Sequence, residues 1–247
     1  MNNLPKISIT TVCFNSAKTL VQTIESVLRQ TYANIEYVIV DGASTDGTMD
    51  IIKKYEPAFD GRMKWISEPD RGIYDAMNKA VKMSNGELIG NLNSDDWIEP
   101  DSAEKAVEEY LKNPGYDVYY GLTRIVTPDG REMEIRRIHP DFMEPTGIFL
   151  HPSTYVSRKT HDKFGLFDTS YRLAADYEFF LRIKKHGAKF KEINHILTNY
   201  RQGGASSNIL NKMEVDRILY KYGVISKGKV IRELIKIKLK QISHRFH

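Results

Sequence analysis

The sequence has a single cysteine and no long apolar run. Cys13 has no second cysteine with which to form an internal disulfide, and its place inside a short apolar segment is more typical of a core residue than of a nucleophile. No stretch of about 18 uncharged apolar residues occurs, so we predict no segment that spans a membrane. Residues 1–5 lack the basic-then-apolar pattern of a secretory signal, and we expect a cytoplasmic protein.

Glycine-rich nucleotide-binding motifs are also absent. No Gly-x-Gly-x-x-Gly follows the first apolar run, and no Gly-x-x-x-x-Gly-Lys-Ser/Thr occurs anywhere. These absences argue against a dinucleotide-dependent oxidoreductase and against a P-loop enzyme. In a chain of this kind, a metal ion and side chains must neutralise the phosphates of a bound nucleotide in place of a glycine cradle.

Positive charge is concentrated at the C-terminus. The chain has a formal net charge of +4, and residues 226–247 carry +6, which leaves −2 for residues 1–225. The tail also has an apolar stripe at helical spacing, formed by Ile231, Leu234, Ile235, Leu239 and Ile242. Such a helix lies on an anionic membrane surface or packs on the domain, and the sequence leaves both open. A nucleic-acid partner is disfavoured, because the body is slightly acidic and Phe246 is the only aromatic residue of the tail.

The first half of the chain alternates strand and helix patterns at short spacing. Strands are predicted at residues 7–13, 35–40 and 63–66 and in the apolar run that ends at Leu92, with helices between them. This alternation implies right-handed crossovers and a mainly parallel sheet with helices on both faces. With 247 residues and 41% hydrophobic content, the chain is long enough for one α/β domain with an appendage.

The pattern of the second half of the chain predicts a smaller mixed sheet. Strand patterns occur at residues 118–126, 132–138, 148–156, 189–193 and 196–200, and helical patterns at 158–164 and 174–183. We therefore expect a domain of residues 1–205 with two halves, 5–97 for the nucleotide and 98–205 for the acceptor. A basic helical appendage, residues 206–247, follows.

Charged residues follow the predicted parallel strands. Because the carboxyl ends of such strands meet at one sheet edge, these side chains are expected to converge: Asp41, Glu68, Asp70, Arg71, Asp95 and Asp96. The run that ends at Leu92 leads directly into Asn93-Ser-Asp-Asp96, whose hard oxygen ligands suit Mg²⁺ or Mn²⁺. The alternative is a polar turn that caps the helix beginning near Pro100.

Five motifs in a fixed order resemble family 2 glycosyltransferases of the GT-A fold. They are Ile9-Thr-Thr-Val-Cys-Phe-Asn15, Val40-Asp-Gly-Ala-Ser-Thr-Asp-Gly-Thr48, Arg71-Gly-x-x-x-Ala-x-Asn78, Leu92-Asn-Ser-Asp-Asp96 and Ala175-Asp176-Tyr177. The resemblance covers roughly residues 5–202. It implies an inverting enzyme with a nucleotide-binding sheet fused to a smaller acceptor-side sheet.

The resemblance also implies roles at the nucleotide. Asp41 matches the residue that recognises uracil, Arg71 and Asn78 lie in the segment that contacts the nucleotide, and Arg71 counters diphosphate charge. Asn93 is placed to bind a ribose hydroxyl, and Asp95 with Asp96 to bind Mn²⁺ or Mg²⁺. Two of these nucleotide motifs depart from the family, with Asp41-Gly-Ala-Ser44 for Asp-Asp-Gly-Ser and Asn93-Ser-Asp95 for Asp-x-Asp. The alternatives are a turn residue at Asp41 and two surface residues at positions 71 and 78.

Asp176 matches the family's catalytic base, which takes the proton of the acceptor hydroxyl. The glutamate usual before it is replaced by Ala175, and Glu178 is the fallback base. Two further candidates for stabilising the leaving group are His151 and Arg201. The aromatic side chains that could stack on sugars are Trp97, Tyr155 and Tyr177, although core packing is the commoner use of such residues.

The sequence therefore predicts a metal-dependent, inverting glycosyltransferase. The expected donor is a nucleotide sugar, above all a UDP-sugar, and the expected acceptor is a hydroxyl of a bacterial surface glycan, such as one linked to a lipid. The basic tail would hold the enzyme on the cytoplasmic face of the membrane. The alternative is a catalytically silent sugar-nucleotide-binding or scaffold protein, which Asn93 and Ala175 allow and which the retention of Asp95 and Asp176 opposes.

Overall fold

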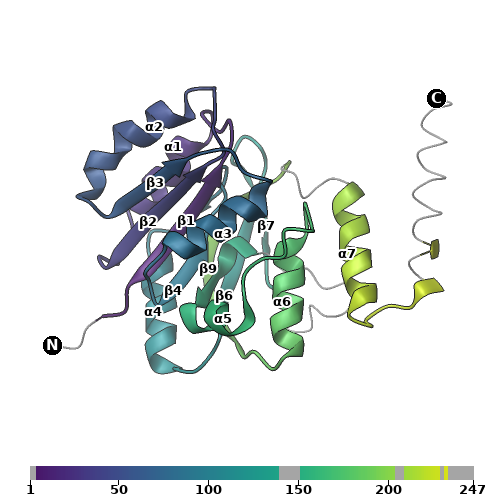
Figure 1. The fold of residues 1–247 in the computed structure, drawn as a ribbon. Coiled ribbons are helices and arrows are strands. Elements are labelled where there is room, and N and C mark those ends of the chain that lie inside the picture. Colours follow the sequence, from purple (N-terminus) through teal and green to yellow (C-terminus); the bar gives the residue numbers. More distant parts are fainter. Residues whose placement is uncertain (1–3, 139–150, 204–208, 229–230, 233–247) are drawn as a thin grey trace.

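The computed structural model describes residues 4–138, 151–203, 209–228 and 231–232 (Figure 1). Within these residues, nine strands form one sheet in the order β3-β2-β1-β4-β8-β6-β9-β5, with β7 paired to β6. The strands are β1 (Ile7–Cys13), β2 (Ile35–Asp41), β3 (Met63–Ser67), β4 (Leu88–Asn91), β5 (Trp97–Ile98), β6 (Val118–Val126), β7 (Glu132–Arg136), β8 (Thr154–Ser157) and β9 (Phe190–Arg201). The helices are α1 (Leu20–Leu28), α2 (Thr48–Tyr55), α3 (Ile73–Met83), α4 (Ser102–Lys112), α5 (Arg158–Phe164), α6 (Ala175–Lys185) and α7 (Ile209–Lys221), with 3₁₀ turns η1 (Glu56–Phe59) and η2 (His151–Ser153).

Strands β3, β2, β1 and β4 form the parallel part of the sheet. Ile7 of β1 pairs with Ile35 on one side and with Leu88 on the other. Every residue of β1 and β2 is buried, as expected for parallel strands that are covered on both faces. The predicted alternation of strands and helices in this half is confirmed.

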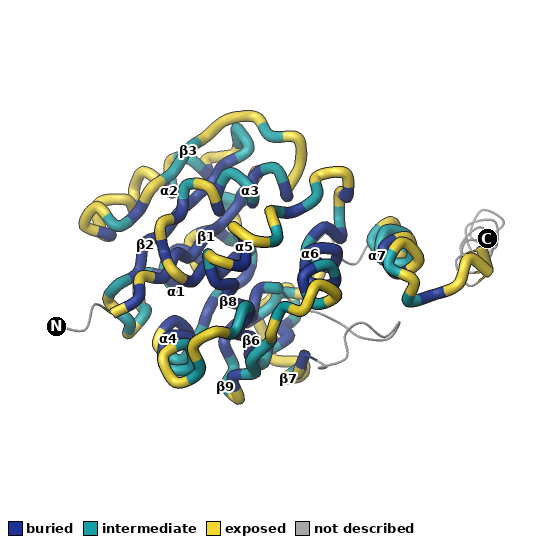
Figure 2. The backbone as a smooth tube through the Cα atoms, turned by 60° about the horizontal axis from the view of Figure 1, so that its bottom comes forward, coloured by how far each residue is buried: buried dark blue, intermediate teal, exposed yellow. Residues whose placement is uncertain are grey.

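Successive residues of a strand enter two separate hydrophobic cores. Val38 and Val40 of β2 lie in the core that contains residues of α3, α6 and α7, whereas Tyr37 and Ile39 lie in the core with α1, α2 and α4. This division follows from the two-residue period of a strand, whose side chains point alternately to opposite faces. Helices therefore cover both faces of the buried sheet, as predicted (Figure 2).

The mixed part continues the same sheet. Strand β8 is antiparallel to both β4 and β6 and joins the two parts edge to edge. Strands β6 and β9 are parallel, and β7 and β5 pair with them in antiparallel fashion. The predicted mixed sheet is thus fused to the parallel part as one continuous surface.

Some predicted boundaries were wrong in this half. The strand predicted at residues 148–156 begins only at Thr154, because η2 precedes it, and residues 148–150 lie outside the described residues. The two strands predicted at 189–193 and 196–200 are one strand, β9. The two-residue strand β5 was missed, since its pairing depends on Thr198 and Asn199, a hundred residues further along the chain.

Helix α7 packs beside α6 (Figure 1). Ile218 and Leu219 are buried in the same core as Phe180 and Ile183 of α6. Most of the basic segment 226–247 lies outside the described residues, so its contact with a membrane and the domain boundary at residue 205 stay predictions. Among the described residues, no helix has the length and apolar character needed to cross a bilayer.

Candidate active site

The loops that follow β1, β2 and β4 are tied together at one edge of the sheet. The Asn15 side chain accepts a hydrogen bond from the Thr45 amide (2.9 Å), and the Asn15 amide donates to Ser44 Oγ (2.7 Å). Ser16 Oγ lies 2.9 Å from Ser94 Oγ in the loop after β4. Because three loops share these bonds, the polar residues that they carry are held in fixed relative positions.

Asp41 ends β2 and is completely buried, with 0% exposure. Its carboxylate accepts hydrogen bonds from the Ser44 amide (2.9 Å), the Ser44 hydroxyl and Ser67 Oγ (2.6 Å), and Cys13 Sγ lies 3.6 Å away. These hydrogen bonds make Asp41 a support of the turn after β2. Its assignment to uracil recognition stays a prediction. Burial, followed by the charge of Asp41, raises the pKa of the Cys13 thiol, which agrees with a core role for that residue.

An exposed aromatic ring and a second carboxylate lie beside this turn. The Phe14 side chain, which follows β1, is 63% exposed. Gly42 separates it from Asp70: a Cβ atom at position 42 would lie 2.7 Å from Asp70 Oδ2 and 3.3 Å from the Phe14 ring. Asp70 is held there because its Oδ1 accepts a hydrogen bond from the Gly72 amide (2.8 Å). The glycine thus lets a flat ring and a carboxylate approach each other.

Arg71 and Asn78 have different environments on the α3 segment. The Arg71 side chain is 81% exposed and forms an ion pair with Asp75 at 3.1 Å, so it remains accessible to a ligand. The Asn78 amide donates to the Phe167 carbonyl (2.9 Å) and accepts from the Phe167 amide (3.0 Å). Both polar atoms of Asn78 therefore hold the loop before α6, and its assignment as a nucleotide contact stays a prediction.

Two adjacent aspartates follow β4 and face different surroundings. Asp96 is 1% exposed, and its carboxylate accepts hydrogen bonds from the Arg201 amide and from Asn93 Nδ2, both at 2.8 Å. It is therefore an internal brace, and its assignment as a metal ligand stays a prediction. Arg201 completes the brace, because its guanidinium donates to the Asp95 carbonyl (3.0 Å) and to Gln22 (2.7 Å) and lies over the Trp97 ring.

Asp95 is half-buried and is the carboxylate of this turn that fits a metal ion. Burial raises its pKa, and the nearby positive charge of Arg201 only partly offsets that effect. A cation would therefore stabilise the ionised form, and a carboxylate is a hard oxygen ligand for Mg²⁺ or Mn²⁺. The described residues contain no group of three or more His, Cys, Asp or Glu side chains around one point. An ion at Asp95 would need the remaining ligands from a diphosphate and water.

Asp176 lies in the first turn of α6, and its side chain contacts one residue of α3 and one residue of η2. Its Oδ1 accepts a hydrogen bond from the Tyr74 hydroxyl (2.7 Å), and its Oδ2 lies 2.8 Å from His151 Nδ1. Its side chain is 19% exposed. Burial acts to raise the pKa of Asp176, but the hydrogen bonds from His151 and Tyr74 and the positive potential of His151 outweigh it and lower the pKa. The group therefore remains a carboxylate.

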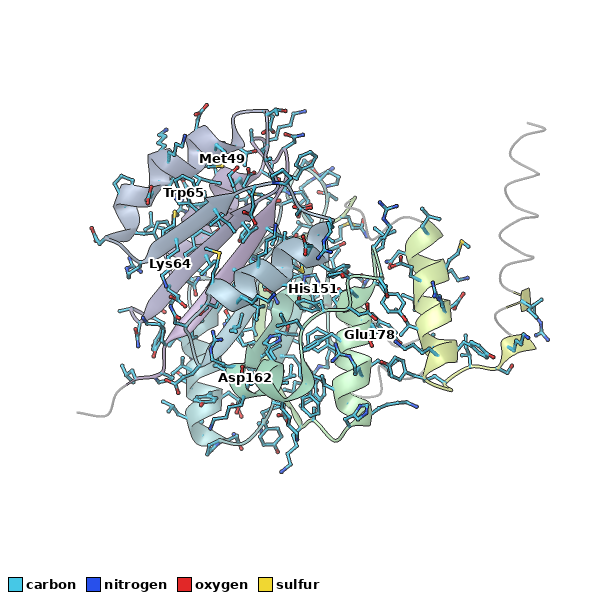
Figure 3. The ribbon with its side chains drawn as sticks, viewed as in Figure 1. Met49, Lys64, Trp65, His151, Asp162 and Glu178 are labelled. Atoms are coloured by element: carbon cyan, nitrogen blue, oxygen red, sulfur yellow. The ribbon has the colours of Figure 1, made fainter. Side chains whose placement is uncertain are left out.

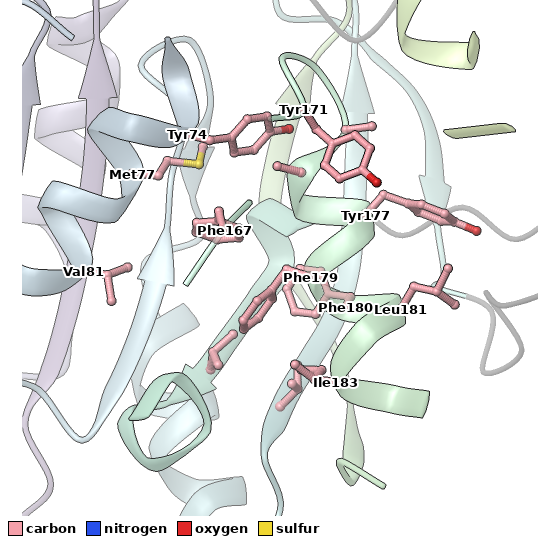
Figure 4. Packing of buried hydrophobic residues seen from close by; sticks show 14 of the residues in the cluster. Tyr74, Met77, Val81, Phe167, Tyr171, Tyr177, Phe179, Phe180, Leu181 and Ile183 are labelled. Atoms are coloured by element: carbon pink, nitrogen blue, oxygen red, sulfur yellow. The ribbon is translucent and has the colours of Figure 1, made fainter. Parts of the chain in front are cut away.

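Aromatic packing fixes the partners of Asp176. Tyr74 contacts Phe167, and Phe167 contacts Phe179 of α6, with ring centroids 5.8 and 5.1 Å apart (Figure 4). His151 lies in η2, between α3 and α6 (Figure 3). The Tyr74 hydroxyl is deeply buried, and burial with the charge of Asp176 raises its pKa well above the ordinary value.

All of these groups lie at one sheet edge. Because β2, β3 and β4 are parallel, the segments after Asp41, Ser67 and Asn91 leave from the same side. Strand β8 is antiparallel to β4, so η2 and its His151 lie beside the end of β4, where the Asp95 loop begins. The nucleotide-side carboxylate Asp95 and the carboxylate Asp176 are thus brought to a common edge.

Three of the remaining candidates, Glu178, Tyr155 and Tyr177, have buried side chains. Glu178 is buried and binds Arg182 (3.2 Å) and the Tyr222 hydroxyl, so it is unsuited to act as a base. The hydroxyl of buried Tyr155 lies 2.8 Å from Ser102 Oγ, and Tyr177 is buried in the α6 core. Sequence reasoning did not single out Tyr74, which donates to Asp176, or the exposed ring of Phe14. Tyr74 lies inside the motif of residues 71–78, which is the signal that could have revealed it.

Comparison with known proteins identifies the family. The sequence model described as Glycosyl transferase family 2 matches residues 8–175. The chain therefore belongs to glycosyl transferase family 2, a family of glycosyltransferase enzymes. The resemblance inferred from the five motifs is confirmed.

A curated relative agrees with this family assignment. The chondroitin synthase of Pasteurella multocida (strain Pm70) is 32% identical over 215 residues, which cover 85% of this chain and 22% of that protein. This chain thus spans less than a quarter of the length of that relative.

Two solved structures share the fold. S. aureus TarS 1–349 in complex with UDP-GlcNAc has a TM-score of 0.70 and 20% identity, covering 87% of this chain and 65% of the other. The mannosyltransferase PcManGT from Pyrobaculum calidifontis, in complex with GDP-Man and Mn²⁺, has a TM-score of 0.71 and 18% identity, covering 92% of this chain and 66% of the other. These likenesses confirm the predicted GT-A fold.

Proposed function

We propose that this chain transfers a sugar from a nucleotide-sugar donor, in the first place a UDP-sugar, to a hydroxyl of a glycan acceptor, with inversion at the anomeric carbon. The observation that carries the proposal is the Asp176 carboxylate, held ionised by Tyr74 and His151 at the edge where the Asp95 loop begins. A nucleotide bound at Asp95 would present its sugar to this carboxylate.

The donor's base would lie on Phe14. An exposed aromatic ring offers a stacking surface, and the adjacent Asp70 carboxylate can accept an N–H of the base. We assign base recognition to Asp70 in preference to Asp41, because Asp41 is fully buried and already accepts hydrogen bonds from Ser44 and Ser67. The relatives support nucleotide-sugar donors in general, since TarS was solved with UDP-GlcNAc and PcManGT with GDP-Man.

The diphosphate would be neutralised by Arg71 and by a divalent ion at Asp95. When bound, Mn²⁺ or Mg²⁺ supplies positive charge to the leaving diphosphate. The exposed Arg71 guanidinium offers a fixed cation with a planar set of donors that match phosphate oxygens. Asn93, which holds Asp96 through its Nδ2, lies next to this site and is proposed to contact the ribose.

Asp176 would act as the base. A carboxylate has about four lone-pair positions. Tyr74 and His151 occupy one on each oxygen and the Tyr177 amide donates a third hydrogen bond, so one position remains for the proton of the acceptor. As the acceptor oxygen bonds to the anomeric carbon, its proton passes to Asp176, and the bond from that carbon to the diphosphate oxygen breaks with its electron pair on the diphosphate.

The acceptor is proposed to be a glycan of a bacterial surface, carried by a lipid. The similarity to a chondroitin synthase supports a polysaccharide acceptor. The basic segment 226–247 would bring the enzyme to an anionic membrane surface. Co-sedimentation with phosphatidylglycerol-containing vesicles tests this part separately, because a chain that stays in the supernatant at low salt would remove the membrane from the proposal.

The enzymatic proposal is tested with a panel of UDP-GlcNAc, UDP-glucose, UDP-galactose, UDP-glucuronic acid and GDP-mannose. Metal-dependent hydrolysis of one donor in the absence of acceptor is expected, together with a rise in Tm on donor binding. Asp176→Asn is expected to keep nucleotide binding and to lower turnover by about 100-fold or more. A variant that turns over at the wild-type rate would refute Asp176 as the base. Donor binding without any turnover, with or without acceptor, would favour the silent sugar-nucleotide-binding protein.

A further inference from the structure

A carboxylate from the C-terminal helix binds the segment that leads into α6. Glu214 of α7 accepts hydrogen bonds from three consecutive backbone amides, those of Arg172 (2.8 Å), Leu173 (2.7 Å) and Ala174 (3.0 Å). These residues directly precede α6, and a negatively charged group is favoured near the N-terminal end of a helix, which carries partial positive charge. Glu214 therefore supplies acceptors for three backbone amides of the segment that leads into the helix.

The bound segment is next to Asp176. Ala174 directly precedes α6, and Asp176 is the second residue of that helix. The Leu173 carbonyl lies 2.9 Å from the Tyr74 hydroxyl, which also donates to Asp176. Leu173 is thus held by Glu214 through its amide, and its carbonyl shares the single proton of the Tyr74 hydroxyl with Asp176. A movement of this segment would displace both Asp176 and its hydrogen-bond donor.

Helix α7 is anchored firmly enough to hold Glu214 in place. Leu219 is buried in the core shared with α6. At the C-terminal end of α7, Lys221 Nζ lies 3.7 Å from Glu178 of α6, and the following residue, Tyr222, donates its hydroxyl to the same carboxylate. Two contact points along one helix fix its position relative to α6.

We propose that Glu214 is a positioning residue for catalysis: it fixes the segment before α6 so that the Asp176 carboxylate keeps its place. This inference rests on the proposed role of Asp176 as the base. Glu214 lies beyond residue 175, where the family match ends, so the brace belongs to the part of the chain outside that match. The C-terminal helix is then part of the catalytic apparatus.

The test compares Glu214→Ala and Glu214→Gln with Val107→Ala as the control for lost stability. Val107 is buried in α4, in the core on the opposite face of the sheet, so its truncation weakens the fold without a change in α7 or in residues 172–174. We expect a kcat lower by 10- to 100-fold, in order of magnitude, for Glu214→Ala, with KM for the donor changed by less than about threefold, because misplacement of a reacting group acts on turnover more than on binding. Glu214→Gln keeps one acceptor oxygen and should fall between Glu214→Ala and the wild type.

Tm separates positioning from stability. Val107→Ala is expected to lower Tm at least as much as Glu214→Ala while keeping kcat within about threefold of the wild type. The inference is overturned when Glu214→Ala, measured below its Tm on the fastest donor of the panel, has the wild-type kcat or the same kcat as Val107→Ala. If Asp176→Asn has normal turnover, the proposed function itself fails; if Asp176→Asn is inactive and Glu214→Ala is not, only the brace is lost.

Discussion

His151 Nδ1 lies 2.8 Å from Asp176 Oδ2, and this contact joins the segment before β8 to the first turn of α6. An ionised carboxylate only accepts hydrogen bonds, so the proton is on Nδ1. The Nε2 atom of the same ring is buried and has no partner among the residues that the structure describes. The ring is therefore oriented by Asp176, and it stabilises the ionised carboxylate in return.

Replacement of His151 by alanine is expected to move the low-pH limit of activity upward. Turnover needs the carboxylate form of Asp176, so activity is lost as pH falls through its pKa. His151 and Tyr74 lower that pKa against the effect of burial, and removal of the histidine raises it. A kcat–pH profile measures the shift. A profile that keeps its acidic limit, in a variant that folds, would contradict the dependence of Asp176 on His151.

Tyr74→Phe removes the other donor to Asp176 without changing the shape of the ring. We expect the acidic limit to move in the same direction as in His151→Ala. Loss of one hydrogen bond to a carboxylate should lower the free energy of unfolding by about 1–3 kcal/mol, as measured by urea denaturation at pH 7. An unchanged stability together with an unchanged pH profile would show that the hydroxyl does not serve Asp176.

Asp95→Asn and Asp96→Asn form a matched pair at adjacent positions. Asp95→Asn is expected to lower metal-dependent turnover by about 100-fold or more, because a cation on the leaving diphosphate supplies several kcal/mol. Asp96→Asn can keep both of its hydrogen bonds if the Asn93 amide turns over. Burial and the charge of Asp95 raise the pKa of Asp96, so loss of the charge should leave stability at pH 7 equal or higher.

Metal titrations of turnover, together with thermal unfolding, measure the two effects. Equal loss of metal response in both variants would return Asp96 to the set of metal ligands. Removal of the ion with EDTA should abolish the turnover of the wild type, and added Mn²⁺ or Mg²⁺ should restore it.

Asp70→Asn and Asp41→Asn separate recognition of the base from support of the turn. Asp70→Asn is expected to weaken UDP binding by about tenfold, as measured by calorimetry, with a small change in Tm, because Asp70 accepts one backbone hydrogen bond in addition to its proposed bond with the base. Asp41→Asn places an amide against the donors of Ser44 and Ser67 and should destabilise the fold by about 1–3 kcal/mol. The reverse pattern would restore Asp41 as the base-binding residue.

Local sequence was sufficient for the parallel half of the fold. The apolar, β-branched segments at residues 7–13 and 35–40 can be buried only as strands covered on both faces, and the predicted bounds agree with β1 and β2 to within a residue. The strand bounds of the second half were predicted less accurately. Strand β5 exists because Trp97 pairs with Asn199, and η2 shortens β8; both depend on neighbours that are distant in the sequence.

For the site, the sequence by itself determined the residue types and the edge of the sheet at which they gather, because parallel strands all end on the same side. Only the tertiary structure decided which carboxylates face outward. Asp95 and Asp96 are neighbours in the chain, yet one is half-buried and the other is enclosed by Arg201 and Asn93. The same holds for Glu214, whose partners lie forty residues away in the chain. The direction of a side chain and the donors that it meets depend on packing between distant segments, and no local pattern encodes them.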